Sequence, residues 1–382
     1  MPLDKSGLFS MLADALEGRS IKKVRVGLTV LGSEHPPEVL IDAAKEAVRN
    51  LDGVEVVLLG AGEGISAPGL QGVKASTLEE AHRIMEKMLD SSELDAAVTM
   101  HYNFPIGVST VGRVVTPARG KPMLIATTTG TSAANRVEAM VKNAIYGIIT
   151  AKALGLEKPS VGILNLDGSR QVERILKLLA ERGYEINFAE SIRADGGSIM
   201  RGNDLLAGSC DVMVTDTLTG NILIKVFSAY TTGGDYEALG WGYGPGIGEG
   251  YKRIILILSR ASGAPVVEGA IRYAAELVRG NLLEKAAEEF EKLREVKFHE
   301  LIGELEKAAK PKEEEDTVPP PKKTVTEEIA GIDVLQMEDA VKVLWKNGIY
   351  AESGMGCTGP VIMVAHEDLK SAVDILKTEG YL

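Results

Sequence analysis

The sequence is poor in cysteine and contains no long apolar run. Its two cysteines, Cys210 and Cys357, lie far apart in a chain of 382 residues, which excludes a disulfide framework and fits a reducing compartment. No apolar run is long enough to span a bilayer, and residues 1–5 lack the charged-then-apolar plan of a signal peptide. We therefore expect a cytoplasmic protein that does not enter the membrane.

Basic residues are fewer than acidic ones. The chain has 54 acidic and 42 basic residues and a net charge of −12, which argues against nucleic acid and anionic membrane surfaces as partners. A phosphorylated small molecule stays open, because one lysine or one helix terminus can hold it. The first expected strand is not followed by Gly-x-Gly-x-x-Gly, which argues against a dinucleotide site. We expect no cofactor and no metal.

The chain is rich in aliphatic residues and glycine. Hydrophobic residues make up 45% of it and aromatic residues only 5%, with 42 glycines, which suits a buried sheet flanked by helices. Short apolar runs alternate with helix-periodic segments, which predicts an α/β fold with a doubly wound, largely parallel sheet. The expected strands cover 24–30, 54–59, 96–100, 123–126, 161–164, 184–188, 212–214 and 254–258. The expected helices cover 8–16, 39–50, 77–89, 135–154, 171–182, 222–230, 266–279 and 282–309.

A change of composition near residue 310 predicts three parts. Residues 1–309 form the main α/β domain. Residues 310–325 are charged and rich in proline, which is typical of an extended linker. Residues 326–382 form a small tethered α+β unit, with helices expected over 337–345 and 367–377 and strands near 349 and over 361–365.

We expect the main domain to be organised around the stretch 210–225. A buried strand over 212–214 leads through a turn into a helix that begins near Ile222. In an open α/β sheet, ligands bind where a strand leads into a helix N-terminus, and free N–H groups there favour an anion. The alternative is a strand–turn–helix corner in which Asp216 and Asn221 serve only as caps. The residues alone leave both interpretations open.

Two further stretches contain unusual glycine patterns. In 240–250 glycine occupies nearly every second position, which argues against a stable strand or helix. This stretch is either a flexible connector, or a lid or backbone cradle that closes over the central corner. In the tail, Cys357 lies among Gly354, Gly356 and Gly359, where exposed N–H groups would favour a thiolate. The alternative is a buried turn cysteine. Cys210, directly before a buried strand, is expected in the core.

Several motifs resemble those of the phosphate acyltransferase family of phospholipid synthesis. Residues 32–39 (GSEHPPEV), 162–165 (GILN) and 216–225 (DTLTGNILIK) resemble that family's strand-end turns, and the likeness covers about residues 24–280. The chain departs from the family pattern at 33–34 and 217–219, which bears on the long-chain acyl substrate more than on phosphate. The resemblance implies a phosphate acyltransferase-like fold.

The whole chain, tail included, is similar to the family of component C alpha subunits of glycine/sarcosine/betaine reductase complexes. That resemblance implies a ketoacyl-synthase-like beta subunit, a selenoprotein component that delivers a two-carbon unit, and acetyl phosphate as the product. A homodimer of the main domain is left open. The alternatives are a free-standing acyl carrier protein–phosphate acyltransferase and a non-catalytic scaffold subunit.

These resemblances and the local chemistry together suggest a set of site residues. Cys357 would hold the acetyl group as a thioester, Lys225 would stabilise phosphate and the developing oxyanion, and His35 would act as acid or base. The residues expected to bind phosphate or substrate are Gly32, Glu34, Asn165, Asp216, Thr219, Gly220 and Asn221.

Overall fold

The computed structural model describes residues 23–61, 66–194, 196–308, 318–333, 336–356 and 359–382. The helix expected over 8–16, residues 310–317 of the expected linker, and Cys357 all lie outside the described residues. None of the helices in the described ranges is long and apolar enough to cross a membrane.

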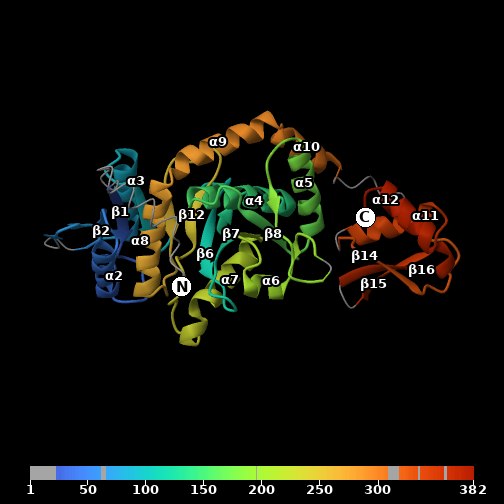
Figure 1. Ribbon diagram of the computed structural model, residues 1–382, viewed down its shortest axis with the longest axis horizontal. Coiled ribbons are helices and arrows are strands. Elements are labelled where there is room, and N and C mark those ends of the chain that lie inside the picture. Colours follow the sequence, from blue (N-terminus) through green and yellow to red (C-terminus); the bar gives the residue numbers. More distant parts are fainter. Residues whose placement is uncertain (1–22, 62–65, 195, 309–317, 334–335, 357–358) are drawn as a thin grey trace.

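The main domain alternates strands and helices along the chain (Figure 1). Its first part contains β1 (Val24–Thr29), α2 (Pro37–Asn50), β2 (Val54–Leu59), β3 (Ser66–Ala67), β4 (Leu70–Val73), α3 (Leu78–Asp90) and β5 (Ala96–Thr99). The middle contains β6 (Val108–Val115), β7 (Pro122–Thr131), α4 (Arg136–Ala153), β8 (Ser160–Leu164), α5 (Ser169–Glu181), β9 (Asn187–Phe188), β10 (Ile199–Met200), α6 (Gly202–Ala207), β11 (Val212–Val214) and α7 (Thr217–Ala229). The last part contains η1 (Tyr230–Thr232), β12 (Gly244–Ile247), β13 (Ile255–Ile257), α8 (Ala264–Arg279), α9 (Leu282–Glu295) and α10 (Phe298–Ala308).

The strands of this domain form one sheet. Its order within the described ranges is β10-β8-β11-β7-β6-β12-β13-β5-β1-β2-β4-β3, and β9 pairs with β8. The pairs are parallel except where β6 meets β7 and β12, where β12 meets β13, and at the edge strand β3. The fold class predicted from the alternating pattern is therefore confirmed: a doubly wound, largely parallel α/β sheet.

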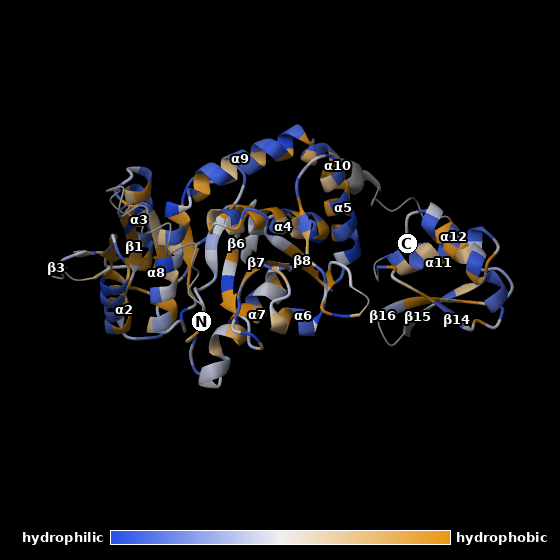
Figure 2. Ribbon diagram, viewed as in Figure 1, coloured by the Kyte–Doolittle hydropathy of each residue, from blue (hydrophilic) through white to orange (hydrophobic). Residues whose placement is uncertain are grey.

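Helices cover both faces of the sheet because alternate strand residues point to opposite sides. Along β2, Val56 and Leu58 belong to one buried cluster, whereas Val57 and Leu59 belong to another. Figure 1 shows α4 and α7 on opposite sides of β7. In Figure 2 hydrophobic residues lie along much of the sheet, whereas the long helix α9 has a strongly hydrophilic outer side. This distribution is typical of a sheet buried on both faces.

The glycine-rich stretch differs from both interpretations of the sequence. Residues 244–247 form β12, a fully buried strand that pairs with β6 and β13 in the middle of the sheet. Glycine is required there by close backbone approach. A Cβ on Gly244 would lie 1.7 Å from the Val111 carbonyl oxygen, and the Gly244 φ is +85°. The connector and lid hypotheses were both wrong, because the lack of side chains allows tight backbone packing here.

Other boundaries also differ from expectation. The strand expected over 184–188 is limited to Asn187–Phe188, and the helix expected over 282–309 is two helices separated at Lys297, whose φ is +56°. The strands β3, β4, β6 and β10 and the short helix α6 were not predicted, because they are short or lack a clear apolar pattern. The helix expected over 222–230 is α7, which begins earlier, at Thr217. The other expected strands and helices of the main domain's described ranges are present.

A buried carboxylate ties α9 to the rest of the domain. Glu289 is 2% exposed and accepts hydrogen bonds from Lys152 (2.9 Å), Lys292 (2.7 Å) and the Tyr184 hydroxyl (2.8 Å). Burial raises the pKa of the Glu289 carboxyl, but these three donors outweigh it and leave the pKa below its ordinary value. The carboxylate is therefore ionised and fully partnered at neutral pH.

Replacing Glu289 by alanine is expected to lower the free energy of unfolding by about 3 kcal/mol at neutral pH, because a buried ion pair loses one partner. Since the folded-state pKa is depressed, this stabilisation is present above the unfolded pKa of about 4.3 and is lost as the pH falls through the folded pKa. Urea denaturation at several pH values measures both effects. The exposed neighbour Glu288→Ala is the control. Equal loss in both variants would contradict the buried-network explanation.

The C-terminal part contains its own antiparallel sheet of order β14-β16-β15. Its elements are β14 (Glu327–Ala330), α11 (Met337–Lys346), β15 (Ala351–Gly356), β16 (Gly359–Val364), η3 (His366–Asp368) and α12 (Leu369–Thr378). These elements pack on a separate buried cluster that includes Leu344 and Ile362. Both expected helices and strands are present, and β14 was not predicted. The three-part division at 309 and 325 stays a prediction.

Candidate functional site

The central corner of the sequence forms the strand–turn–helix that was predicted. β11 ends at Val214, and Asp216 caps α7: its Oδ1 accepts a hydrogen bond from the Thr219 N–H at 2.8 Å. The Thr219 hydroxyl donates to Asp216 Oδ2 at 3.2 Å, and Arg136 donates to the same oxygen at 2.6 Å. Asp216 therefore serves as the N-cap, and its carboxylate is neutralised by an arginine from α4.

Gly220 brings α7 against the backbone of β7. A Cβ at this position would lie 1.7 Å from the Thr127 carbonyl oxygen and 2.7 Å from the Thr215 hydroxyl. The Gly220 N–H donates to the Asp216 carbonyl at 3.0 Å, so it is already used inside the helix. Gly220 thus allows α7 to pack closely against β7. The sequence analysis expected its backbone to bind an anion, and that role stays a prediction.

Replacing Gly220 by alanine is expected to lower the free energy of unfolding by about 3 kcal/mol, because the added methyl group meets backbone that cannot move without shifting α7. Urea denaturation measures this change. Gly202→Ala is the matched control, since a Cβ there meets no atom within 4 Å. A Gly220→Ala protein as stable as the control would show that α7 can move away from β7 at little cost.

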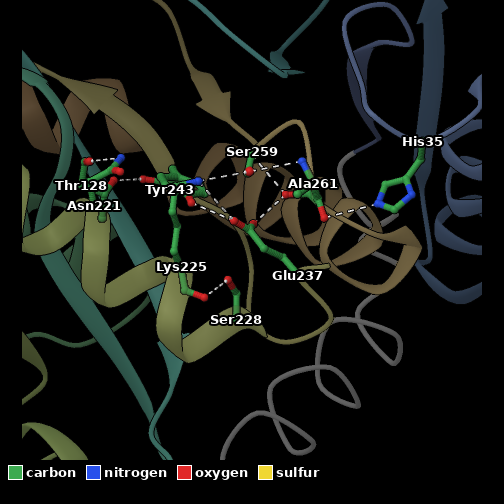
Figure 3. A network of polar contacts seen from close by, with 10 residues as sticks. His35, Thr128, Asn221, Lys225, Ser228, Glu237, Tyr243, Ser259 and Ala261 are labelled. Carbon is green, nitrogen blue, oxygen red and sulfur yellow. Dashed lines mark hydrogen bonds and ion pairs between the residues drawn. The ribbon is translucent and has the colours of Figure 1, made fainter. Parts of the chain in front are cut away.

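A chain of polar contacts runs from α7 across to the first turn of the domain (Figure 3). At one end, Asn221 Nδ2 donates to the Thr128 carbonyl at 3.0 Å, and the Thr128 hydroxyl donates to the Tyr243 carbonyl at 2.7 Å. In the middle, Lys225 Nζ lies 3.4 Å from the Ser259 hydroxyl and 5.5 Å from the centre of the Tyr243 ring. Asn221 and Lys225, one helical turn apart, are thus held in the same network.

A buried carboxylate lies beneath Lys225. Glu237 is 3% exposed and accepts hydrogen bonds from the Tyr243 hydroxyl (2.8 Å) and the Ser262 hydroxyl (2.8 Å). Lys225 Nζ lies 3.9 Å from the same carboxylate, and its side chain is 53% exposed. Burial and the neighbouring Glu237 charge raise the pKa of Tyr243 well above its ordinary value, so the phenol stays neutral and donates. The partly exposed Lys225 side chain is therefore held beside the buried Glu237 carboxylate.

His35 lies at the other end of this network. Its Nε2 is 3.3 Å from the Ala261 carbonyl oxygen, and its ring packs edge-on against Tyr236. The Ala261 N–H in turn donates to the Ser259 hydroxyl at 3.2 Å. Because a carbonyl oxygen only accepts, Nε2 must carry a proton and Nδ1 is the acceptor of the neutral ring. His35 can therefore accept a proton at Nδ1.

The remaining predicted residues separate into two groups. Gly32, with a φ of +87°, and the exposed Glu34 share the turn of His35, where the Glu34 N–H donates to the Arg260 carbonyl at 2.9 Å. Asn165 is not part of the network in Figure 3. It follows β8 and is exposed, and its Oδ1 lies 3.5 Å from the Ser169 hydroxyl. The structure thus links Lys225 to the His35 turn through Ser259 and Ala261, and places Asn165 at a different strand end.

Sequence reasoning missed the anchoring residues Glu237, Tyr243, Ser259, Ser262 and Arg136. Tyr243 lies inside the glycine-rich stretch, but no spacing linked it to Glu237 or to Lys225. Cys210 is fully buried, and burial raises the pKa of its thiol to about 12, so its expected place in the core is confirmed. Cys357 lies outside the described residues. In the part of the chain that the structure describes, no group of three or more His, Cys, Asp or Glu side chains could hold a metal ion.

The chain matches the family described as fatty acid synthesis protein over residues 24–363. The glycine/sarcosine/betaine reductase complex component C subunit alpha of Peptoclostridium acidaminophilum is 59% identical over 97% of this chain and 96% of that protein. Phosphate acyltransferase of Thermotoga maritima is 28% identical over 53% of this chain and 68% of that protein. A branched-chain phosphotransacylase from Enterococcus faecalis V583 aligns with a TM-score of 0.46 and 16% identity, over 67% of this chain and 99% of that one.

Proposed function

Because the chain belongs to the fatty acid synthesis protein family, and within it to the component C alpha subunits of glycine/sarcosine/betaine reductase, we propose that it is the acyl-transferring subunit of such a complex. It takes a two-carbon acyl unit from a partner-bound intermediate and passes it to inorganic phosphate, which gives acetyl phosphate. The partners are a ketoacyl-synthase-like beta subunit and the selenoprotein component. The observation that supports this best is the solvent-facing Lys225 ammonium, held on the buried Glu237 at the predicted anion site.

The first step uses Cys357. Its thiolate attacks the carbonyl carbon of the activated two-carbon unit, a sulfur–carbon bond forms, and the donor's leaving group departs with its electron pair. In the second step a phosphate oxygen attacks the thioester carbonyl. The carbon–sulfur bond then breaks, acetyl phosphate is released, and the Cys357 thiolate is restored. Atoms and charge balance without a cofactor.

The main domain supplies the groups for the second step. Lys225 binds the phosphate dianion and stabilises the negative charge that develops on the carbonyl oxygen, and it acts as a point charge. Its anchor limits its motion, so little reorganisation is needed as that charge grows. His35 accepts the phosphate proton at Nδ1 as the oxygen attacks. Asn221 holds α7 against β7 through the carbonyl of Thr128.

The direct test of this proposal is to look for the intermediate. The full chain is incubated with its partner components and isotopically labelled glycine, phosphate is omitted, and the digested protein is analysed by mass spectrometry. We expect a labelled acetyl group on the peptide that contains Cys357 and none on the Cys210 peptide. Labelled acetyl phosphate that forms on addition of phosphate, with no prior adduct on Cys357, would remove the cysteine from the reaction.

A second candidate function is a free-standing acyl carrier protein–phosphate acyltransferase, which the similarity to the phosphate acyltransferase of Thermotoga maritima favours. This function needs neither the C-terminal unit nor a partner subunit. It predicts that the purified chain alone converts long-chain acyl carrier protein and phosphate to acyl phosphate. Absence of that turnover, together with acetyl phosphate formation in the presence of the partner components, would decide for the reductase complex.

A further inference from the structure

A cavity of about 410 Å³ lies where the C-terminal unit meets the main domain. The main domain contributes the turn after β8, where Asn165 lies, and the loop around Gly196 and Gly197. The C-terminal unit contributes residues 330–333 and Pro360, which stands three residues after Cys357 in the sequence. The cavity is separate from the network of Lys225 and His35.

The charges around this cavity differ from those of the chain as a whole. Three arginines line it, Arg170 from the first turn of α5, Arg193 from the loop before β10, and Arg201 directly after β10. The two carboxylates that also line it are engaged: Asp167 lies 3.7 Å from Arg136, and Asp333 accepts a hydrogen bond. Arg170 is in turn paired with Glu173 at 3.3 Å, and the other N–H groups of its guanidinium can donate elsewhere. Three arginines against two aspartates still give the lining a positive formal charge, in a chain whose net charge is −12.

The cavity wall is also open to close approach by a ligand. Gly196 and Gly197 have φ values of +63° and +84°, and a Cβ on either would meet no atom within 4 Å. Backbone is thus exposed at this part of the wall. Guanidinium groups from three different elements, together with exposed backbone, suit a planar or tetrahedral oxyanion, because arginine donates two parallel hydrogen bonds to such groups.

Two contacts join the units beside this cavity. Asp333, which is 7% exposed, accepts a hydrogen bond from the Gly168 N–H at 2.8 Å, at the beginning of α5. Arg174, further along α5, donates to the Gly380 carbonyl at 2.6 Å. An anion bound by main-domain arginines in the cavity would add a third connection, and it would lie against the residues next to Asp333.

We propose that this cavity binds a phosphate-type oxyanion through Arg170, Arg193 and Arg201, and that the bound anion fastens the C-terminal unit to the main domain. This is a second anion site, beyond the acceptor site at Lys225 of the proposed function. The phosphoryl group is shared by inorganic phosphate and by acetyl phosphate. Either would favour the docked position of the unit whose sequence contains Cys357.

The test uses the full chain with Lys225→Met, so that the acceptor site does not contribute. Calorimetric titration with inorganic phosphate, and separately with acetyl phosphate, then measures the binding that does not depend on Lys225. We expect saturable binding of at least one of the two, and a rise of about 10- to 100-fold in its Kd when Arg201→Gln or Arg170→Gln is added. The ligand that binds more tightly identifies the physiological source. Lys252→Gln, an exposed position outside the cavity, is the charge-matched control and should leave the Kd unchanged.

Hydrogen exchange of the Gly168 amide reports the docking, because this amide donates to Asp333. Added ligand should slow its exchange in the Lys225→Met protein and leave it unchanged in the protein that also has Arg201→Gln. No binding in Lys225→Met, or binding unaffected by both arginine variants, would overturn this inference. Neither result would affect the proposed function, which is judged by the acetyl adduct on Cys357.

Discussion

Acetyl phosphate formation is expected to fall about 10³-fold or more when Cys357 is replaced by serine, because removal of a covalent nucleophile eliminates the route it opens. A serine hydroxyl is almost wholly protonated at neutral pH, whereas a cysteine thiol has a far larger ionised fraction and its thiolate is the better nucleophile. The measurement is the initial rate of acetyl phosphate release by the complete set of components at saturating phosphate.

The other cysteine provides the matched control for this experiment. Cys210 is fully buried and burial raises the pKa of its thiol, so it is inert, and Cys210→Ala should retain the wild-type rate once its folding has been verified. Binding of the partner subunits to Cys357→Ser should also be unchanged, since the substitution replaces one atom. If Cys357→Ser releases acetyl phosphate at the wild-type rate, the thioester is not on the reaction path and direct transfer from the partner to phosphate becomes the better explanation.

Replacing Lys225 by methionine is expected to lower kcat/KM for phosphate about 10²- to 10³-fold, the usual effect of removing one group that stabilises charge in the transition state. Methionine keeps most of the length and the apolar stem, so the loss reports the charge. The first step should survive, because it takes place at Cys357. In the absence of phosphate, the acetyl adduct should therefore form in Lys225→Met as it does in the wild-type protein.

Two variants make this result specific to Lys225. Lys225→Arg keeps the charge and should recover part of the rate, whereas the exposed Lys252→Met removes a charge elsewhere and should change little. The buried Glu237 loses its nearby cation in Lys225→Met, so the melting temperature is measured alongside the kinetics. A Lys225→Met protein that turns over phosphate normally, at unchanged stability, would place the acceptor site somewhere else in the molecule.

The alternation of apolar runs and helix-periodic segments was enough to predict the doubly wound sheet and the corner at residues 212–225. Such elements can be predicted from local sequence, because a buried parallel strand is a short apolar run whereas an amphipathic helix repeats its apolar residues every three to four positions. The same logic failed at β12, where glycine at every second position argued against a strand. Its buried place in the sheet depends on the neighbouring backbone of β6, which no local pattern records.

The individual residues of the candidate site could be predicted from the sequence, but the contacts between them could not. Lys225 and Asn221 share a helix and His35 follows the first strand, so the sequence named them individually. The contact of His35 with Ala261 spans 226 positions of the chain, and that of Lys225 with Ser259 spans 34. Glu237 had no sequence signal, because a buried carboxylate is distinguished by the donors that fold around it and not by its neighbours in the chain.

The sequence by itself determined the α/β class and the core position of Cys210, since each depends on residues close together in the chain. It placed the start of the central helix near Ile222, whereas α7 begins at Thr217. Only the tertiary structure decided which strand ends share a site, since crossover connections bring distant turns to one edge of the sheet. It joined the His35 turn to Lys225 and placed Asn165 beside the arginine-lined cavity at the C-terminal unit. The physical reason is that the ends of neighbouring strands meet in space irrespective of their separation along the chain.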